Sequence, residues 1–399
     1  MIARPEISII MPLYNTEQWL GTAIESVMLQ EGPSWELLAV DDGSTDESLN
    51  LLKQYVERDN RIKLLRNAGI KGAGGSRNTA LREAHGKNIF FFDSDDALFP
   101  GALRLLHGLM ADSDSPVVRG VSTFFCQQRW LAGEPDDTSG RVEISRNSHP
   151  SFGFWLHLYN AEFLSANGLS FPEDLIIGQD RAFLWQVYFL LSSVPVVHSP
   201  IYLYRINHKL PNPSSFKSRA FLNGLLRIRQ SCLDTGNDAL IAHLLQGAFI
   251  PEWLGRLYPM YQEGRDSALE FLEGCTRILS GHEDAVAGEL RQQMGEQSKE
   301  FLRHCKSGNT EGMLAALEEA GCIAPPAGYM GIRRPTSGLG WQCYRLARRM
   351  RSLTSLSDES RRTMLYLYML RRNSLRRLRG LPPASLGDFW KAGAQHASQ

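Results

Sequence analysis

Three carboxylates stand almost together in the segment FFFDSDDALFP, residues 90–100. Asp93, Asp95 and Asp96 follow three aromatic residues, and no lysine or arginine stands beside them in the sequence to offset their repulsion. Two carboxylates at positions i and i+2, at the end of a strand, can turn their oxygens toward one divalent cation such as Mg²⁺, Mn²⁺ or Ca²⁺. The segment therefore indicates a divalent-metal site, with a solvated, helix-capping acidic turn as the alternative.

A closed calcium loop does not fit this segment. If Asp93 were position 1 of such a loop, the glycine expected at position 6 would be Leu98 and the glutamate expected at position 12 would be Arg104. Too few protein ligands remain to enclose an ion, so oxygens of a substrate must complete the coordination. Phosphates commonly do this for Mg²⁺ and Mn²⁺. The pattern favours a metal whose coordination is completed by phosphate oxygens of a substrate.

The elements around the aspartates alternate between strand and helix. Short apolar strands are expected at residues 7–11, 36–40, 62–65 and 88–92, and helices at 17–30, 49–58 and 76–85, after the Gly-rich loop 69–75. This alternation predicts an α/β fold with a mostly parallel, doubly wound sheet. Ligands bind such sheets outside the carboxyl ends of the strands, where Asp41, Asp42 and Asp93 would lie.

The chain of 399 residues is long enough for more than one domain. We expect a catalytic domain at residues 1–215, a helical domain at 216–330 and a basic helical tail at 331–399. The net charge is zero, but the tail holds fourteen Lys/Arg and three Asp/Glu, which leaves an acidic body. The tail is therefore expected either to meet an anionic membrane surface or to pack on the body of the protein. Nucleic acid is disfavoured, because the aromatic residues of the tail cluster with apolar ones instead of alternating with the arginines.

Cysteine usage and the N-terminus indicate a cytoplasmic protein. The six cysteines are scattered without a Cys-x-x-Cys pair, as is typical of reduced thiols. The first residues, MIARPEISIIMPLYN, lack the apolar core of a signal peptide. The longest charge-free run, residues 182–204, contains Gln186, His198 and two prolines, so we interpret it as buried helix and strand. Peripheral contact with the inner membrane leaflet, through the tail, remains compatible with these features.

Five motifs carry a resemblance to a known family. They are IIMPLYNTEQWLGTAIESVMLQ, LLAVDDGSTDES, GGSRNTAL, FFFDSDDALFPGAL and IGQDRAF. Their order and spacing resemble those of the inverting family-2 glycosyltransferases, which have the A-type (nucleotide-diphospho-sugar transferase) fold. The resemblance covers about residues 5–207 and does not extend to the C-terminal half.

The resemblance implies a nucleotide pocket lined by Pro12, Tyr14, Asn15, Asp42, Arg77 and Asp93. In such a pocket the ring of Tyr14 would stack on the base, and Asp42 would accept a hydrogen bond from the uracil ring. Arg77 would reach the base or the phosphates, and Asp93 would hold the ribose side. Taken singly, each of these residues could instead be a packed aromatic, a turn residue or a surface charge.

The resemblance also implies a metal ligand and a catalytic base. Asp95 would bind the Mn²⁺ or Mg²⁺ that bridges the diphosphate, and Asp180 of IGQD would be the base. The family usually has Glu before this aspartate, where this chain has Gln179, but a base needs only one carboxylate near the acceptor hydroxyl. The Gly-rich loop also departs from the pattern Gly-x-Gly-x-x-Gly, because Arg77 replaces the third glycine, and this disfavours a dinucleotide fold.

The expected function is a hexosyltransferase-like reaction. A sugar would pass from a nucleotide-diphosphate donor, most simply a UDP-sugar, to a hydroxyl of a surface polysaccharide or a lipid-linked glycan, with inversion. Two alternatives stay open. A nucleotidyltransferase would need a basic Gly-rich phosphate loop near the N-terminus, where this chain has MPLYN. A non-catalytic, membrane-recruited module that binds nucleotide sugars would not need Asp93, Asp95 and Asp180 together.

Overall fold

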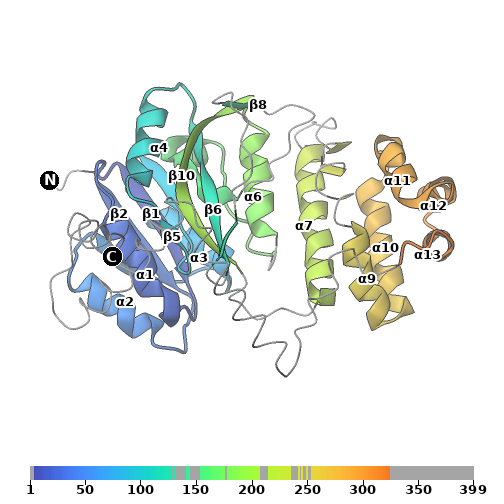
Figure 1. Ribbon diagram of the computed structural model, residues 1–399, viewed down its shortest axis with the longest axis horizontal. Coiled ribbons are helices and arrows are strands. Elements are labelled where there is room, and N and C mark those ends of the chain that lie inside the picture. The colour runs from blue at the N-terminus through green and yellow to red at the C-terminus, as the bar shows by residue number, and fades with distance from the viewer. Residues whose placement is uncertain are drawn as a thin grey trace, which may run out of the picture.

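A mixed β-sheet with helices on both faces forms the N-terminal part of the protein, and a group of helices follows it (Figure 1). The computed structural model describes residues 4–126, 129–131, 141–143, 153–175, 178–206, 214–234, 241–242, 244–245, 249 and 253–323. The predicted basic tail lies outside these residues, so its contact with a membrane stays a prediction. Within the described residues, none of the helices combines the length and apolar character that crossing a bilayer requires.

The N-terminal half of the sheet is parallel, as predicted. Its four strands are β1 (Ile7–Leu13), β2 (Trp35–Asp41), β3 (Ile62–Arg66) and β4 (Asn88–Phe91). The central strand β1 pairs with β2 on one side and with β4 on the other, and β3 pairs with β2. The carboxyl ends of β2 and β4 therefore flank that of β1.

The second half of the sheet is mixed. The strand order is β3-β2-β1-β4-β9-β6-β10-β5; in addition, β7 pairs with β6 and β8 pairs with β10. The added strands are β5 (Ala97–Leu98), β6 (Val117–Cys126), β7 (Arg129–Leu131), β8 (Arg141–Glu143), β9 (His157–Asn160) and β10 (Ser193–Ile206). Strand β9 is antiparallel to both of its neighbours, whereas β6 and β10 are parallel to each other. The alternating pattern of residues 1–92 did not foretell this change of direction.

The two faces of the sheet bury separate cores, because successive side chains of a strand point to opposite sides. Ile9 packs with the helices α1 and α2, and Ile10 packs on the other face with α3 and α6. The helices of this part are α1 (Glu17–Met28), α2 (Ser48–Val56), α3 (Ala73–Glu83), α4 (Ala102–Ala111), α5 (Ala161–Ala166) and α6 (Gln179–Tyr188).

The C-terminal helices share a core with the sheet domain through α6. They are α7 (Ser214–Asp234), α9 (Trp253–Glu263), α10 (Arg265–Leu279), α11 (Ala287–Met294), α12 (Gln297–Lys306) and α13 (Thr310–Glu319). Ala182 and Trp185 of α6 belong to the same apolar cluster as Leu225 and Trp253 of these helices. Helix α6 stands between the sheet and α7 (Figure 1). The predicted boundary at residue 215 falls within the first turn of α7 and stays a prediction.

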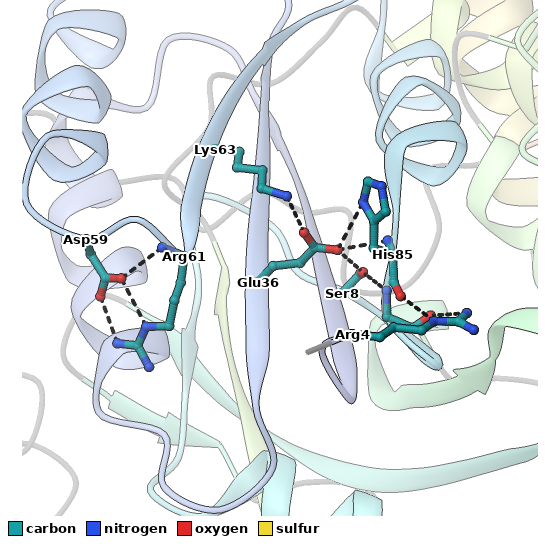
Figure 2. A network of polar contacts seen from close by, with 8 residues as sticks. Arg4, Ser8, Glu36, Asp59, Arg61, Lys63 and His85 are labelled. Atoms are coloured by element: carbon teal, nitrogen blue, oxygen red, sulfur yellow. Dashed lines mark hydrogen bonds and ion pairs between the residues drawn. The ribbon is translucent and has the colours of Figure 1, made fainter. Parts of the chain in front are cut away.

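A buried carboxylate joins the amino ends of the strands (Figure 2). Glu36 is 5% exposed, and its Oε1 accepts hydrogen bonds from Ser8 Oγ at 2.6 Å and from the His85 N–H at 2.8 Å. Its Oε2 accepts one from Lys63 Nζ at 2.7 Å. Burial alone would raise the pKa of Glu36, but the hydrogen bonds outweigh it and lower the pKa. The carboxylate therefore stabilises β1, β2 and β3 in its ionised form.

We expect Glu36→Gln to lower the free energy of unfolding by about 1–3 kcal/mol at pH 7, since it removes a buried acceptor of charge-assisted hydrogen bonds. Because folding lowers the pKa of Glu36, its stabilisation is present above the pKa of the unfolded carboxyl. It is lost as the pH falls through the folded pKa, so the two proteins should converge in stability in acid. Urea titrations at several pH values measure this. Glu57→Gln, at an exposed residue, is the control, and equal losses in both variants would contradict the prediction.

Candidate active site

Two acidic clusters lie at the carboxyl edge of the parallel strands. Asp41 and Asp42 come at the end of β2, and Asp93 follows β4. Since β1 lies between β2 and β4, the segment after β1, which includes Tyr14 and Asn15, lies between the two clusters. The fold thus collects the predicted nucleotide-binding residues at one edge of the sheet.

The three carboxylates after β4 converge. One oxygen from each of Asp93, Asp95 and Asp96 lies within 4.8 Å of the others. Asp95 is 4% exposed and Asp96 is 1% exposed, so little water can screen their repulsion. Oxygen donors in such a group suit a hard divalent cation. The residues present therefore fit the metal that the sequence predicts.

Two arginines from distant parts of the chain offset the negative charge. Arg77 of α3 donates from Nη2 to Asp93 Oδ1 at 2.7 Å. Arg205 of β10 donates from Nε to the main-chain oxygen of Asp95 at 2.9 Å, and its guanidinium lies 4.1 Å from the ring centre of Trp19. No cation stands next to the aspartates in the sequence, but tertiary folding supplies two.

Asp96 acts as an anchor for the acidic segment. Its Oδ2 accepts a hydrogen bond from the Tyr202 hydroxyl at 2.8 Å, and its Oδ1 accepts one from the Arg205 N–H at 2.7 Å. The Tyr202 oxygen in turn accepts the N–H of Asp93 at 3.2 Å. Burial, followed by the charges of Asp95 and Asp93, raises the pKa of Asp96 well above its usual value. Since protein groups occupy both oxygens of Asp96, Asp93 and Asp95 are the residues suited to hold a metal.

Arg77 is fixed between aromatic rings. Its guanidinium lies 4.5 Å from the ring centre of Phe154 and 5.1 Å from that of Phe171, and the residue is 6% exposed. Its Nε has no hydrogen-bond partner within the described part of the chain. The sequence suggested that Arg77 would reach the base or phosphates, and the structure directs one of its nitrogens to Asp93.

Asp42 closes the Gly-rich loop. Its Oδ1 accepts a hydrogen bond from Asn67 Nδ2 at 2.7 Å, and its Oδ2 accepts the N–H of Gly72 at 2.9 Å. Gly72 has a φ of 131°, which glycine adopts readily. Helix α3 begins directly afterwards, at Ala73, so the predicted start at Ser76 is three residues late. Gly74 and Gly75, predicted to lie in the loop, form the first turn of the helix.

Tyr14 offers an open aromatic face beside this loop. The residue is 49% exposed, and Lys71 Nζ lies 5.3 Å from the centre of its ring. Asn15 has a φ of 49°, and its side chain accepts the N–H of Thr45 at 2.8 Å. Thr45 thus binds the segment after β1, and α2 starts three residues later, at Ser48. Pro12 is a half-buried residue of β1 opposite Val40.

Asp180 lies on a separate element, in the first turn of α6. Within the described residues it does not join the cluster of three carboxylates. It lines a cavity of about 220 Å³ between α6, α7 and α9, together with Gly178, Arg181, Phe221, Gly224, Leu225, Ile228 and Arg256. The neighbouring Gln179 packs against Gly74 of α3. The contact is so close that a methyl group at Gly74 would collide with Gln179 Oε1. The first turn of α6 therefore lies between the Gly-rich segment and the C-terminal helices.

The segment before α6 is tied to α3 by Asn78 and Glu173. Asn78 accepts the N–H of Phe171 at 2.9 Å and donates to its carbonyl oxygen at 2.8 Å. Glu173 accepts the N–H of Ile70 at 2.8 Å and a hydrogen bond from Asn78 at 2.9 Å. These contacts hold residues 171–173 against the Gly-rich loop. Sequence reasoning assigned no role to Asn78, Tyr202 or Arg205. Of the three, only Asn78 lies in one of the five motifs, GGSRNTAL.

Known proteins are similar to this chain in sequence and in fold. Residues 8–157 match the family model described as "Glycosyl transferase family 2". The chain is 28% identical over 231 residues to the putative glycosyltransferase EpsH of Bacillus subtilis. This alignment covers 55% of this chain and 66% of EpsH. It is also 41% identical over 114 residues to WfgD of Escherichia coli, named as a UDP-Glc:alpha-D-GlcNAc-diphosphoundecaprenol beta-1,3-glucosyltransferase. That alignment covers 29% of this chain and 44% of WfgD.

Solved structures with the same fold include residues 1–349 of Staphylococcus aureus TarS in complex with UDP. That structure covers 79% of this chain and 90% of its own, with a TM-score of 0.61 and 19% sequence identity. The complex of the same protein with UDP-GlcNAc has a TM-score of 0.60 and 18% identity. These findings show the A-type fold, and they identify residues 8–157 as a match to glycosyltransferase family 2. The fold and the family expected from the sequence are thereby confirmed.

We expect Tyr202→Phe to weaken binding of Mn²⁺ to the aspartates by about tenfold, because outer contacts that orient metal ligands are typically worth 10–100-fold in affinity. The variant removes the hydroxyl that links Asp96 to the Asp93 N–H. Electron paramagnetic resonance of free Mn²⁺ gives the affinity. Tyr188→Phe, which removes a buried hydroxyl bound to His157, is the control. Unchanged affinity in a folded Tyr202→Phe protein would show that this hydroxyl does not position the ligands.

Proposed function

We propose that this protein is an inverting glycosyltransferase that uses a UDP-sugar and a divalent metal to extend a polysaccharide or a lipid-linked glycan. The observation that carries the proposal is the convergence of Asp93 and Asp95 at the carboxyl edge of the sheet, held by Tyr202 and Arg205. The names of the relatives support the substrate classes. TarS binds UDP and UDP-GlcNAc, and WfgD is named for a UDP-glucose donor and a diphosphoundecaprenol-linked acceptor.

The nucleotide would bind across the carboxyl edge of β1, β2 and β4. The exposed ring of Tyr14 would stack on the base, with Asn15 and Pro12 beside it and Asp42 at the uracil edge. Asp93 would hold the ribose side, and Arg77 would keep the Asp93 carboxylate oriented through their ion pair. Asp95 would hold Mg²⁺ or Mn²⁺, which when bound neutralises charge that develops on the leaving diphosphate.

Asp180 would be the base. As the acceptor hydroxyl attacks the anomeric carbon, its proton passes to a carboxylate oxygen of Asp180, and the bond between that carbon and the diphosphate oxygen breaks on the opposite face. The configuration is inverted because attack and departure occur on opposite sides. The cavity beside Asp180, with apolar residues and two arginines in its walls, would let the acceptor approach from the side of α7.

The other two classes of function are less well supported. A nucleotidyltransferase would direct a basic loop at the phosphates near β1, whereas the loop after β1 carries Tyr14 and Asn15. A module that only binds nucleotide sugars would not require Asp180 at the start of α6. Turnover of a nucleotide sugar separates all three classes, because only a glycosyltransferase releases free nucleotide diphosphate from it.

We expect Asp95→Asn to abolish sugar transfer and to weaken UDP binding in the presence of Mn²⁺, with little change in chelator. The amide lacks the charge that a hard cation prefers. Calorimetric UDP titrations with and without metal, together with a donor-hydrolysis assay across several nucleotide sugars, measure both effects. Asp112→Asn, at the exposed end of α4, should behave as the unmodified protein. Equal UDP affinity of the unmodified protein with and without metal would refute metal-dependent donor binding.

We expect Asp180→Asn to lower kcat by roughly 10²–10⁴, the usual contribution of a general base, while UDP binding stays intact. Steady-state transfer rates and UDP titrations give the two quantities. Asp174→Asn is the matched control, because Asp174 is an exposed residue of the preceding loop. Near-normal turnover in Asp180→Asn, with loss of activity in Asp174→Asn, would move the role of base to Asp174.

A further inference from the structure

A larger cavity lies at the edge of the sheet opposite the candidate active site. Its volume is about 840 Å³, within the roughly 300–1,000 Å³ typical of small-molecule sites. Residues before β1, at the starts of β2 and β3, and just after α3 line it: Arg4, Pro5, Ser34, Trp35, Glu36, Asn60, Arg61, Lys63, Ala84 and His85. Strand β2 spans seven residues between this edge and Asp41. At about 3.3 Å per residue, roughly 20 Å separates the two edges.

The walls of this cavity carry an excess of positive charge. Arg4, Arg61 and Lys63 are cationic, and Glu36 is the one carboxylate among the described lining residues. Glu36 already accepts hydrogen bonds from Ser8, Lys63 and the His85 N–H. Arg4 donates to the carbonyl oxygens of His85 at 2.6 Å and Gly86 at 3.3 Å, and within the described residues it forms no ion pair. Its charge is therefore uncompensated there.

The cations are held in place by other protein groups (Figure 2). The Arg61 guanidinium binds both oxygens of Asp59, at 2.7 and 3.0 Å, and lies 3.8 Å from the ring centre of Trp35. Lys63 is fixed by Glu36. Arg61 and Lys63 nevertheless keep 43% and 47% of their side chains exposed. A ligand would thus meet oriented donors and would cause little further loss of side-chain entropy.

We propose that this cavity is a second ligand site, which binds a small organic phosphate. Guanidinium and ammonium groups are the usual partners of phosphate oxygens, and Arg4, Arg61 and Lys63 supply both kinds. Pro5, Trp35 and Ala84 give the walls an apolar portion against which a sugar ring or a similar body can lie. The phosphate can belong to a soluble metabolite or to a lipid headgroup. The site is independent of the donor pocket, because it lies beyond the amino ends of the strands.

Calorimetry on the full chain tests the proposal with glucose 1-phosphate as the probe. Saturating UDP and Mn²⁺ are included, so that the candidate donor pocket is occupied. The unmodified protein should bind the probe at one site, and Arg4→Gln and Arg61→Gln should each weaken binding by about tenfold, as expected for loss of a charge-assisted hydrogen bond. Arg4→Lys should retain most of the affinity. Lys53→Gln, at an exposed residue of α2 outside the cavity, is the matched control and should bind normally.

Parallel titrations with inorganic phosphate and with vesicles that contain phosphatidic acid identify the source of the phosphate. Binding of glucose 1-phosphate supports a soluble ligand, and binding of vesicles alone supports a headgroup. The proposal is overturned if none of the three probes binds, or if the Arg4 and Arg61 variants bind as the unmodified protein does. Hydrolysis of the sugar donor without added probe should be unchanged in both variants. If the unmodified protein hydrolyses no sugar donor, the proposed function is refuted, while the proposal of a second ligand site is unaffected.

Discussion

The repulsion among Asp93, Asp95 and Asp96 is the constraint that the rest of the structure must meet. Three carboxylates with oxygens within 4.8 Å of one another, two of them almost fully buried, would disfavour the folded chain if they stood alone. Tyr202 and the main chain of Arg205 hold Asp96, and Arg77 pairs with Asp93. Burial, followed by the charges of Asp95 and Asp93, raises the pKa of Asp96 well above its usual value. The acidic segment directly follows β4, but it depends equally on β10, the strand that carries Tyr202 and Arg205.

The same constraint organises the region around α6. Arg77 can point at Asp93 because Phe154 and Phe171 enclose its guanidinium. Phe171 is in turn held by Asn78, the residue after Arg77. The chain then continues into α6, so the contact that orients an arginine toward the aspartates also fixes the approach to Asp180. Within the described residues, α3 links Asp93, through Arg77, to the segment that precedes Asp180, through Asn78.

Sequence reasoning found the features that depend on local pattern. The four parallel strands, the helices between them and the acidic turns at their carboxyl ends all follow from apolar periodicity and turn residues, with errors of a few residues at the ends. It missed what depends on contacts across more than a hundred residues, such as Tyr202 with Asp96. It also missed the early start of α3, because Gly74 and Gly75 read as loop, whereas close packing against Gln179 and the Ile70 carbonyl explains why they are glycines.

Glutamine stands at position 179, where the resemblance to family 2 implies glutamate, and its packing against Gly74 offers a physical explanation. Gln179 Oε1 is buried, and within the described residues it has no hydrogen-bond donor. A neutral amide oxygen tolerates such a place at a cost of about 1–3 kcal/mol, while an ionised carboxylate left unpaired there would cost considerably more or take up a proton. A glutamate would therefore need a rearrangement of the contact with Gly74 before it could carry charge. With glutamine at this position, Asp180 is the one carboxylate in the first turn of α6, and the proposed proton transfer has a single acceptor on that helix.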